Sequence, residues 1–150
     1  MVGFMSIQTV TQNDYIKLIN VWESSVRATH DFLSEQDIIE LKPLILEHYF
    51  DAVDLLCFRV DDNNIAGFIG VAESNIEMLF VDPMYFSKGI GKQLTQYAIK
   101  YQSANKVDVN EQNPKAIGFY KKLGFVEIGR SPIDGQGKPF PLIHMVFDET

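Results

Sequence analysis

Residues 78–94 of the chain read MLFVDPMYFSKGIGKQL, and the order of features in this stretch decides how the fold is interpreted. An apolar strand ends at Val81, a loop follows, and two glycines at alternate positions, Gly89 and Gly91, open a helix. Such glycines leave backbone N–H groups uncovered, and the N-terminus of a helix carries a partial positive charge. The turn Ser87–Lys92 is therefore a candidate site for a phosphate or pyrophosphate group.

Two common phosphate-binding loops do not fit this stretch. A P-loop needs a glycine where Phe86 stands and a serine or threonine where Gln93 stands. A dinucleotide-binding fingerprint needs a third small residue at the position of Leu94. A left-handed turn followed by an ordinary helix start stays open as the alternative interpretation.

The length of 150 residues and the lack of a linker-like or repeated segment predict one domain over residues 1–150. Hydrophobic periodicity predicts helices first, then a strand meander, then alternating helices and strands. Pro43 is expected to kink the second helical stretch or to start a new helix within it. This element order predicts an α/β or α+β sandwich. The strands are expected at Phe4–Val10, Leu55–Val60, Ile65–Glu73, Asn75–Val81, Lys106–Asn110, Phe125–Arg130 and Leu142–Phe147, and the helices at Tyr15–Val26, 34–49, Gly89–Tyr101 and Pro114–Leu123.

Composition excludes several classes of protein. The longest apolar run, Ile65–Ala72, has eight residues, whereas a membrane helix needs about 20. No Lys or Arg precedes Lys17, so a signal peptide is not indicated and we expect a soluble, cytoplasmic chain. Cys57 is the single cysteine, and the three histidines lack metal-ligand spacing, so no metal is expected. The net charge of −7 disfavours general nucleic-acid binding.

A second stretch carries a family resemblance. Residues 110–125 read NEQNPKAIGFYKKLGF. With the Gly-x-Gly helix start upstream, this pattern resembles the GNAT superfamily of acyl-CoA-dependent N-acetyltransferases, in the family's order and spacing. Residues 25–33 (SVRATHDFL) and 137–142 (GKPFPL) are similar to small bacterial YjaB-type members. The resemblance implies a mixed, mostly antiparallel central sheet flanked by about four helices. Phe86 departs from it, because the family usually has Arg or Gln at that position.

The resemblance also implies a mechanism, in which a primary amine attacks the thioester of acetyl-CoA directly. Tyr120 matches the general acid that protonates the leaving thiolate, and Glu77 is our first choice for the general base. Glu73, His30, Asp31 and His144 are the other candidate bases. The residues implied to bind the coenzyme are Leu79, Phe80, Val81, Ser87, Lys88, Gly89, Ile90, Gly91, Lys92, Asn113 and Phe119. An acceptor pocket is expected from His30, Phe32, Tyr49, Phe140 and His144.

The acceptor itself is left open between a protein lysine or N-terminus and a small-molecule amine, and the chain between a monomer and a homodimer. Two other functions are considered. A non-catalytic acyl-CoA sensor would keep the coenzyme site without turnover, although Tyr120 at the acid position argues against it. Acetylation of charged tRNA fits poorly with the net charge of −7.

Overall fold

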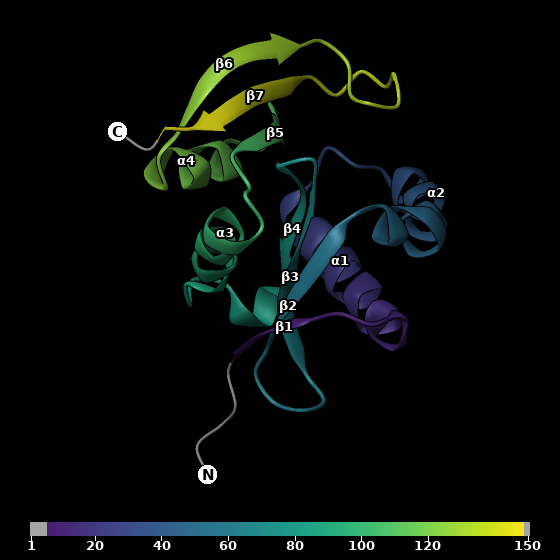
Figure 1. Ribbon diagram of the computed structural model, residues 1–150. Coiled ribbons are helices and arrows are strands. Elements are labelled where there is room, and N and C mark those ends of the chain that lie inside the picture. Colours follow the sequence, from purple (N-terminus) through teal and green to yellow (C-terminus); the bar gives the residue numbers. More distant parts are fainter. Residues whose placement is uncertain (1–5, 149–150) are drawn as a thin grey trace.

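The computed structural model describes residues 6–148, within which seven strands form one sheet in the order β1-β2-β3-β4-β5-β7-β6 (Figure 1). Of the strand pairs in this part of the chain, β4 with β5 is parallel and the others are antiparallel. Four α-helices accompany the sheet in the same residues, so the expected mixed, mostly antiparallel architecture is confirmed. The strands are β1 (Ser6–Thr9), β2 (Asp54–Arg59), β3 (Ile65–Ala72), β4 (Asn75–Val81), β5 (Lys106–Asn110), β6 (Phe125–Ser131) and β7 (Leu142–Phe147).

The α-helices are α1 (Tyr15–Thr29), α2 (Glu35–Leu44), α3 (Ile90–Tyr101) and α4 (Pro114–Lys122), and the short helical turns are η1 (Gln12–Asp14), η2 (Ile45–Tyr49), η3 (Phe50–Ala52) and η4 (Pro83–Tyr85). The expected elements are found within a few residues of their predicted bounds. Residues 4 and 5 of the first expected strand lie outside the described residues. In the described range 6–148, no helix is both long and apolar enough to cross a membrane.

The helix type changes just after Pro43, where the sequence predicted a kink or a new helix. Pro43 lies inside α2, which ends one residue later at Leu44. Because proline has no N–H to donate, the regular hydrogen-bond pattern cannot continue through it. The chain then forms the wider π-helical turn η2, while the N–H of Ile45 donates to the carbonyl oxygens of both Leu41 and Lys42.

Helices cover both faces of the sheet (Figure 1). α1 and α2 pack on one face, where Leu18 and Trp22 are buried against Phe68 of β3. α3 and α4 pack on the other face, where Leu94 is buried against Ile69 of β3. Adjacent residues of β3 thus face opposite cores, as alternation along a strand requires.

The parallel pair β4–β5 is short, and this shapes the site. Helix α3 is the crossover between the two strands, which pair at two positions, the last of them joining Ile76 to Val107. The next residue of β4, Glu77, forms a β-bulge, because Ile76 and Met78 on either side of it pair with consecutive residues of β3. Bulges commonly redirect side chains beside functional sites. Beyond this point the remaining edge of β4 is free of β5.

Candidate active site

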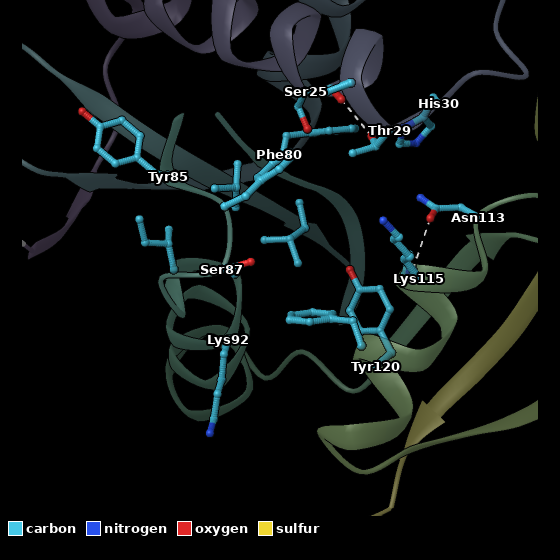
Figure 2. A pocket seen from close by; sticks show the side chains of 18 of the residues that line it. Ser25, Thr29, His30, Phe80, Tyr85, Ser87, Lys92, Asn113, Lys115 and Tyr120 are labelled. Atoms are coloured by element: carbon cyan, nitrogen blue, oxygen red, sulfur yellow. Dashed lines mark hydrogen bonds between the residues drawn. The ribbon is translucent and has the colours of Figure 1, made fainter. Parts of the chain in front are cut away.

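A first cavity of about 900 Å³ lies beside the free end of β4. Its walls come from the end of α1, the last residues of β4, the start of α3, and α4 (Figure 2). Most of the residues expected to bind a coenzyme come together here. The cavity is lined by Leu79, Phe80, Val81, Ser87, Gly89, Ile90, Gly91, Lys92, Asn113 and Phe119, together with His30, Tyr120 and the unusual Phe86, whereas Lys88 is not among its lining residues.

The turn before α3 has the backbone needed to bind an anion. Ser87 and Gly89 adopt left-handed conformations, with φ of 63° and 79°, and α3 begins at Ile90. A Cβ atom added at Gly89 would have no heavy atom within 4 Å, so glycine serves the backbone angle there and not a tight contact. The first N–H groups of a helix have no partner within the helix. The turn therefore offers free donors to a negatively charged group.

The positive charge that reaches into the first cavity comes from a different lysine than expected. Figure 2 shows the Lys92 side chain extending away from the centre of the cavity. Lys115, which the sequence analysis did not single out, lies at the start of α4 and extends toward the centre. The lysine that reaches inward is thus supplied by α4 and not by α3.

The free edge of β4 runs along the cavity. Leu79 and Phe80 pair with β3 on one side, while the pairing with β5 has already ended at Ile76. Unpaired N–H and C=O groups at such an edge bind an extended ligand in the manner of an added strand. The side chain of Phe80 faces the α1 core, whereas Leu79 faces the α3 core.

Helix α4 begins at the cavity. Asn113 caps it, since its side-chain oxygen accepts a hydrogen bond from the N–H of Ala116 at 3.2 Å. Phe119 contacts Gly91 across the cavity wall: a Cβ atom added at Gly91 would lie 3.4 Å from its ring. A glycine at this position lets α3 and α4 approach closely beside the anion-binding turn.

Tyr120 is buried, with its hydroxyl toward the cavity (Figure 2). The residue is 6% exposed, and its ring packs edge-on against Phe119 and Phe125 with centroid distances of 5.0 and 5.4 Å. Within residues 6–148 the phenol oxygen has no hydrogen-bond partner. Burial raises the pKa of the Tyr120 phenol above its ordinary value, so the group is neutral and carries a proton to donate.

The end of α1 and the loop after it form an aromatic corner. The His30 ring lies 5.1 Å from that of Phe32 and 6.2 Å from that of Phe80, and Phe32 in turn lies 5.8 Å from Phe140 in the β6–β7 loop. Burial lowers the pKa of His30, against the opposing effect of the Asp31 carboxylate. Three of the five residues expected in an acceptor pocket, His30, Phe32 and Phe140, are therefore linked by ring contacts.

Glu77 and His144 lie elsewhere, in a second cavity of about 370 Å³. Glu73 also lines it, whereas the candidate bases His30 and Asp31 line the first cavity. Val107 and Val109 of β5 face the α3 core, so Asp108 between them faces the second cavity. The two expected catalytic side chains, Tyr120 and Glu77, thus line different cavities.

The sequence contains no direct indication of the partners of His144. Its Nδ1 lies 2.5 Å from the Oδ1 of Asp108, and its Nε2 lies 2.6 Å from the Oγ of Ser131. The alternation of polar and apolar residues in β5 was a usable signal for Asp108, but the strand neighbours of His144 depend on pairing across the sheet. In the described part of the chain, no group of three or more His, Cys, Asp or Glu side chains is arranged to hold a metal ion.

Comparison with known proteins gives a consistent result. Residues 35–147 match the family model described as an acetyltransferase (GNAT) domain. The chain is 40% identical to the peptidyl-lysine N-acetyltransferase YjaB of Salmonella typhimurium, over 87% of this chain and 90% of that protein. The solution structure of apo-form YjaB from Escherichia coli has a TM-score of 0.86 at 33% identity, over 98% of this chain and 99% of that one.

A more distant structure extends the likeness in fold. The PaiA N-acetyltransferase from Thermoplasma acidophilum, determined in complex with coenzyme A, has a TM-score of 0.74 at 22% identity. The two chains are covered over 97% and 99% of their lengths, respectively. The architecture of the whole described chain, and not of one segment, is therefore shared.

Proposed function

The chain belongs to the GNAT acetyltransferase family and is an N-acetyltransferase, and from this premise we propose that it acetylates lysine side chains of proteins, with acetyl-CoA bound in the first cavity. The relatives at 40% and 35% identity, both YjaB proteins, are named peptidyl-lysine N-acetyltransferases, which supports lysine as the acceptor. Terminal amines of proteins and small amines are the alternatives that the experiment below distinguishes.

The residues of the first cavity fit a coenzyme A ligand. Its anionic pyrophosphate suits the free N–H groups of the Ser87–Lys92 turn, with Lys115 adding positive charge. The amide-containing arm suits the free edge of β4 at Leu79–Val81. Asn113 and Phe119 complete the wall on the α4 side. The coenzyme supplies an acetyl group on a thioester.

We propose that Tyr120 is the general acid of the reaction. The observation on which this proposal rests is a neutral phenol, fixed by two phenylalanine rings, whose hydroxyl faces the cavity without a protein partner. In transfer to an amine, a C–N bond forms and the C–S bond breaks, so the sulfur needs a proton. Tyr120 gives that proton. A free backbone N–H near Phe80 or Val81 stabilises the negative charge that develops on the carbonyl oxygen.

Glu77 is proposed as the base. A lysine amine is mostly protonated at neutral pH and must lose a proton before it attacks. Glu77 lies on the bulge at the point where β4 leaves β5, with its exposed carboxylate in the second cavity. It takes the first proton from the nitrogen, and the second, released as the amide forms, restores the proton on Tyr120. The overall reaction thus releases one proton, which leaves through Glu77.

Two measurements test this function. Thermal unfolding is followed with acetyl-CoA, free coenzyme A or ATP, each at millimolar concentration. A ligand at 100 times its Kd adds about 2.7 kcal/mol, a shift of several degrees. We expect the shift with both coenzymes and not with ATP. The same shift with ATP, or no shift with acetyl-CoA, would contradict the proposed coenzyme site.

The acceptor is then identified by mass spectrometry on a peptide library in which each sequence is made with lysine, with arginine at the same position, and with a free or blocked N-terminus. Lysine acetylation that is independent of the N-terminus supports the proposal. Acetylation of only the N-termini, or of only small amines, would contradict it. Coenzyme binding without turnover on any amine would favour the sensor function instead.

A further inference from the structure

A row of three side chains crosses the sheet in the second cavity region, on strands β5, β7 and β6. Asp108 and His144 stand directly opposite each other in the β5–β7 ladder, and the carboxylate lies 2.5 Å from Nδ1. On the other side of β7, the Ser131 hydroxyl lies 2.6 Å from Nε2. His144 is thus bonded at both ring nitrogens, by groups from two different strands.

The two partners suit both protonation states of the imidazole. With Asp108 ionised, Nδ1 carries the hydrogen and donates to it, which leaves Nε2 to accept from the Ser131 hydroxyl. When Nε2 gains a proton it becomes a donor, and the same hydroxyl accepts because it can rotate. No hydrogen bond is lost in the exchange. A histidine that serves only as a structural bridge needs just one of these states.

The sheet leaves space beside this ring. Gly129 is the residue opposite His144 on β6, and a Cβ atom added there would lie 3.8 Å from the ring, so a larger side chain would cover it. Just before Gly129, Ile128 is a bulge without a partner on β7 and lines the second cavity. The side chain of His144 is 31% exposed, so the imidazole is accessible to solvent.

The Asp108 end of this row lies on the strand that pairs with β4, which carries Glu77, the proposed base. β4 and β5 pair last at Ile76 and Val107, and the next residues along the two strands are Glu77 and Asp108. Both line the second cavity with His144. The row therefore runs from the place where β4 leaves β5, across β5 and β7, to β6.

We propose that Nε2 of His144 accepts, through solvent in the second cavity, the proton that Glu77 takes from the acceptor amine, while Nδ1 keeps the hydrogen that it donates to Asp108. This rests on the proposed function and adds a second proton-transfer step to it. An imidazole is in general a stronger base than a carboxylate, so the proposed transfer runs from Glu77 to His144 and not the reverse. Glu77 returns to its charged form, and His144 then releases the proton to water. His144 acts through Glu77 and does not touch the substrate.

Four other charged groups line the second cavity together with the imidazole. Asp108 faces it from β5, Glu77 from β4 and Glu73 from the β3–β4 turn, while Lys106 of β5 is the opposing cation lining the same cavity. On β6, Glu127 is turned toward α4, where it pairs with Lys121 at 3.7 Å. Three carboxylates thus stand against one ammonium around the second cavity.

The first test is spectroscopic and needs no acceptor. The protein is labelled with ¹⁵N-histidine, saturated with coenzyme A, and its ring nitrogens are followed by NMR from pH 5 to 9, with His144 assigned by comparison with His144→Gln. We expect a neutral form with the proton on Nδ1 and a full protonation step within this range. A ring that keeps one protonation state throughout, or carries its neutral proton on Nε2, would overturn the proposal.

The second test is kinetic, on the lysine peptide that the wild type acetylates fastest in the library described above. We expect His144→Gln to lower kcat by roughly 10- to 100-fold, and the fall of kcat at low pH to change shape. His144→Ala should recover activity when free imidazole is added. His48→Gln, at an exposed histidine of η2, is the control and should behave as the wild type does.

The outcomes separate this inference from the proposed function. If acetyl-CoA still stabilises His144→Gln and the wild type acetylates lysine, the donor site and the reaction stand. Under those conditions, an unchanged kcat and pH profile in His144→Gln would overturn the role of His144 alone. If the wild type acetylates no lysine peptide, the proposed function fails and takes this inference with it.

Discussion

Tyr120 of α4 has a fully packed ring and a hydroxyl that faces the first cavity, where it can donate a proton. We predict that Tyr120→Phe lowers kcat by about 100-fold on the preferred lysine peptide. The substitution removes only an oxygen atom without a protein partner, so unfolding temperature and stabilisation by acetyl-CoA should stay near the wild-type values. Steady-state rates and thermal unfolding check this. Tyr101→Phe, at an exposed tyrosine of α3, is the matched control.

A loss of activity in Tyr120→Phe that came with lost acetyl-CoA binding would contradict the acid role, because the ring would then serve to shape the cavity. Equal rates for both variants would contradict it as well.

Two glycines near the first cavity should respond to alanine with opposite signs. Gly89 has a φ of 79°, so Gly89→Ala should cost about 1 kcal/mol in unfolding free energy. Gly118 lies inside α4 with no heavy atom within 4 Å of an added Cβ, so Gly118→Ala should stabilise by about 0.5–1 kcal/mol. Urea denaturation measures both. Equal effects on stability would mean that the backbone angle at Gly89 is not what requires glycine.

At the scale of elements, the ion pair between Asp14 and Arg59 fastens η1 to β2 at 2.7 Å, with both side chains largely buried. Burial raises the pKa of Asp14, but hydrogen bonds from the N–H of Thr11 and from Arg59 outweigh it, and the net pKa is lowered from 3.8. A lowered pKa gives stability that is complete above about pH 4 and is lost as the pH falls through the lowered pKa.

We therefore predict that Asp14→Asn loses about 1–2 kcal/mol at pH 7 and that its stability declines less steeply than that of the wild type below pH 4. Unfolding by urea between pH 2 and 7 gives the comparison. Asp54→Asn, at an exposed carboxylate of β2, is the control, and its unfolding free energy should decline below pH 4 as that of the wild type does. If the unfolding free energies of the wild type and Asp14→Asn declined equally steeply below pH 4, the ion pair would not contribute to stability at acid pH.

The elements themselves were largely predictable because their signals are local. Ser34 and Asp37 cap α2 through reciprocal hydrogen bonds of 3.0 Å, and this spacing is legible in the sequence. Alternation fixed β5 and β7 for the same reason. The bulge at Glu77 and the early end of the β4–β5 pairing were not predictable, because they depend on partners distant in the chain. These two features concern Glu77 and the free edge of β4 in particular.

The same distinction, between local signals and contacts of distant residues, applies to the site. Most residues of the first cavity belong to two continuous motifs, 78–94 and 110–125, and the others come from the end of α1 and the residues just after it. His144 was predicted only as a single residue, since its partners on β5 and β6 are 36 and 13 positions away. The absence of Lys88 from the cavity lining, and the inward direction of Lys115, depend on side-chain orientation that a motif does not specify.

At the scale of the whole molecule, the two cavities differ in charge. The first has glycine N–H groups and an inward lysine, which suit an anionic coenzyme. The second has Glu73, Glu77 and Asp108 against Lys106, within a chain of net charge −7. A negative field attracts a cationic acceptor and raises its rate of encounter. Donor and acceptor are thus expected to be drawn to different parts of the surface.

This difference predicts how salt should act on the reaction. Screening shortens from about 10 Å at 0.1 M salt to about 3 Å at 1 M, so long-range attraction fades as salt rises. For a lysine peptide flanked by arginines, we expect KM to rise a few-fold between 0.05 and 0.5 M NaCl with little change in kcat, because the field acts on encounter and not on chemistry. The same acceptor flanked by aspartates should show a KM that falls or stays level. Steady-state rates at saturating acetyl-CoA measure both, and an identical salt response for the two peptides would mean that the net negative charge of the chain plays no part in selecting its acceptor.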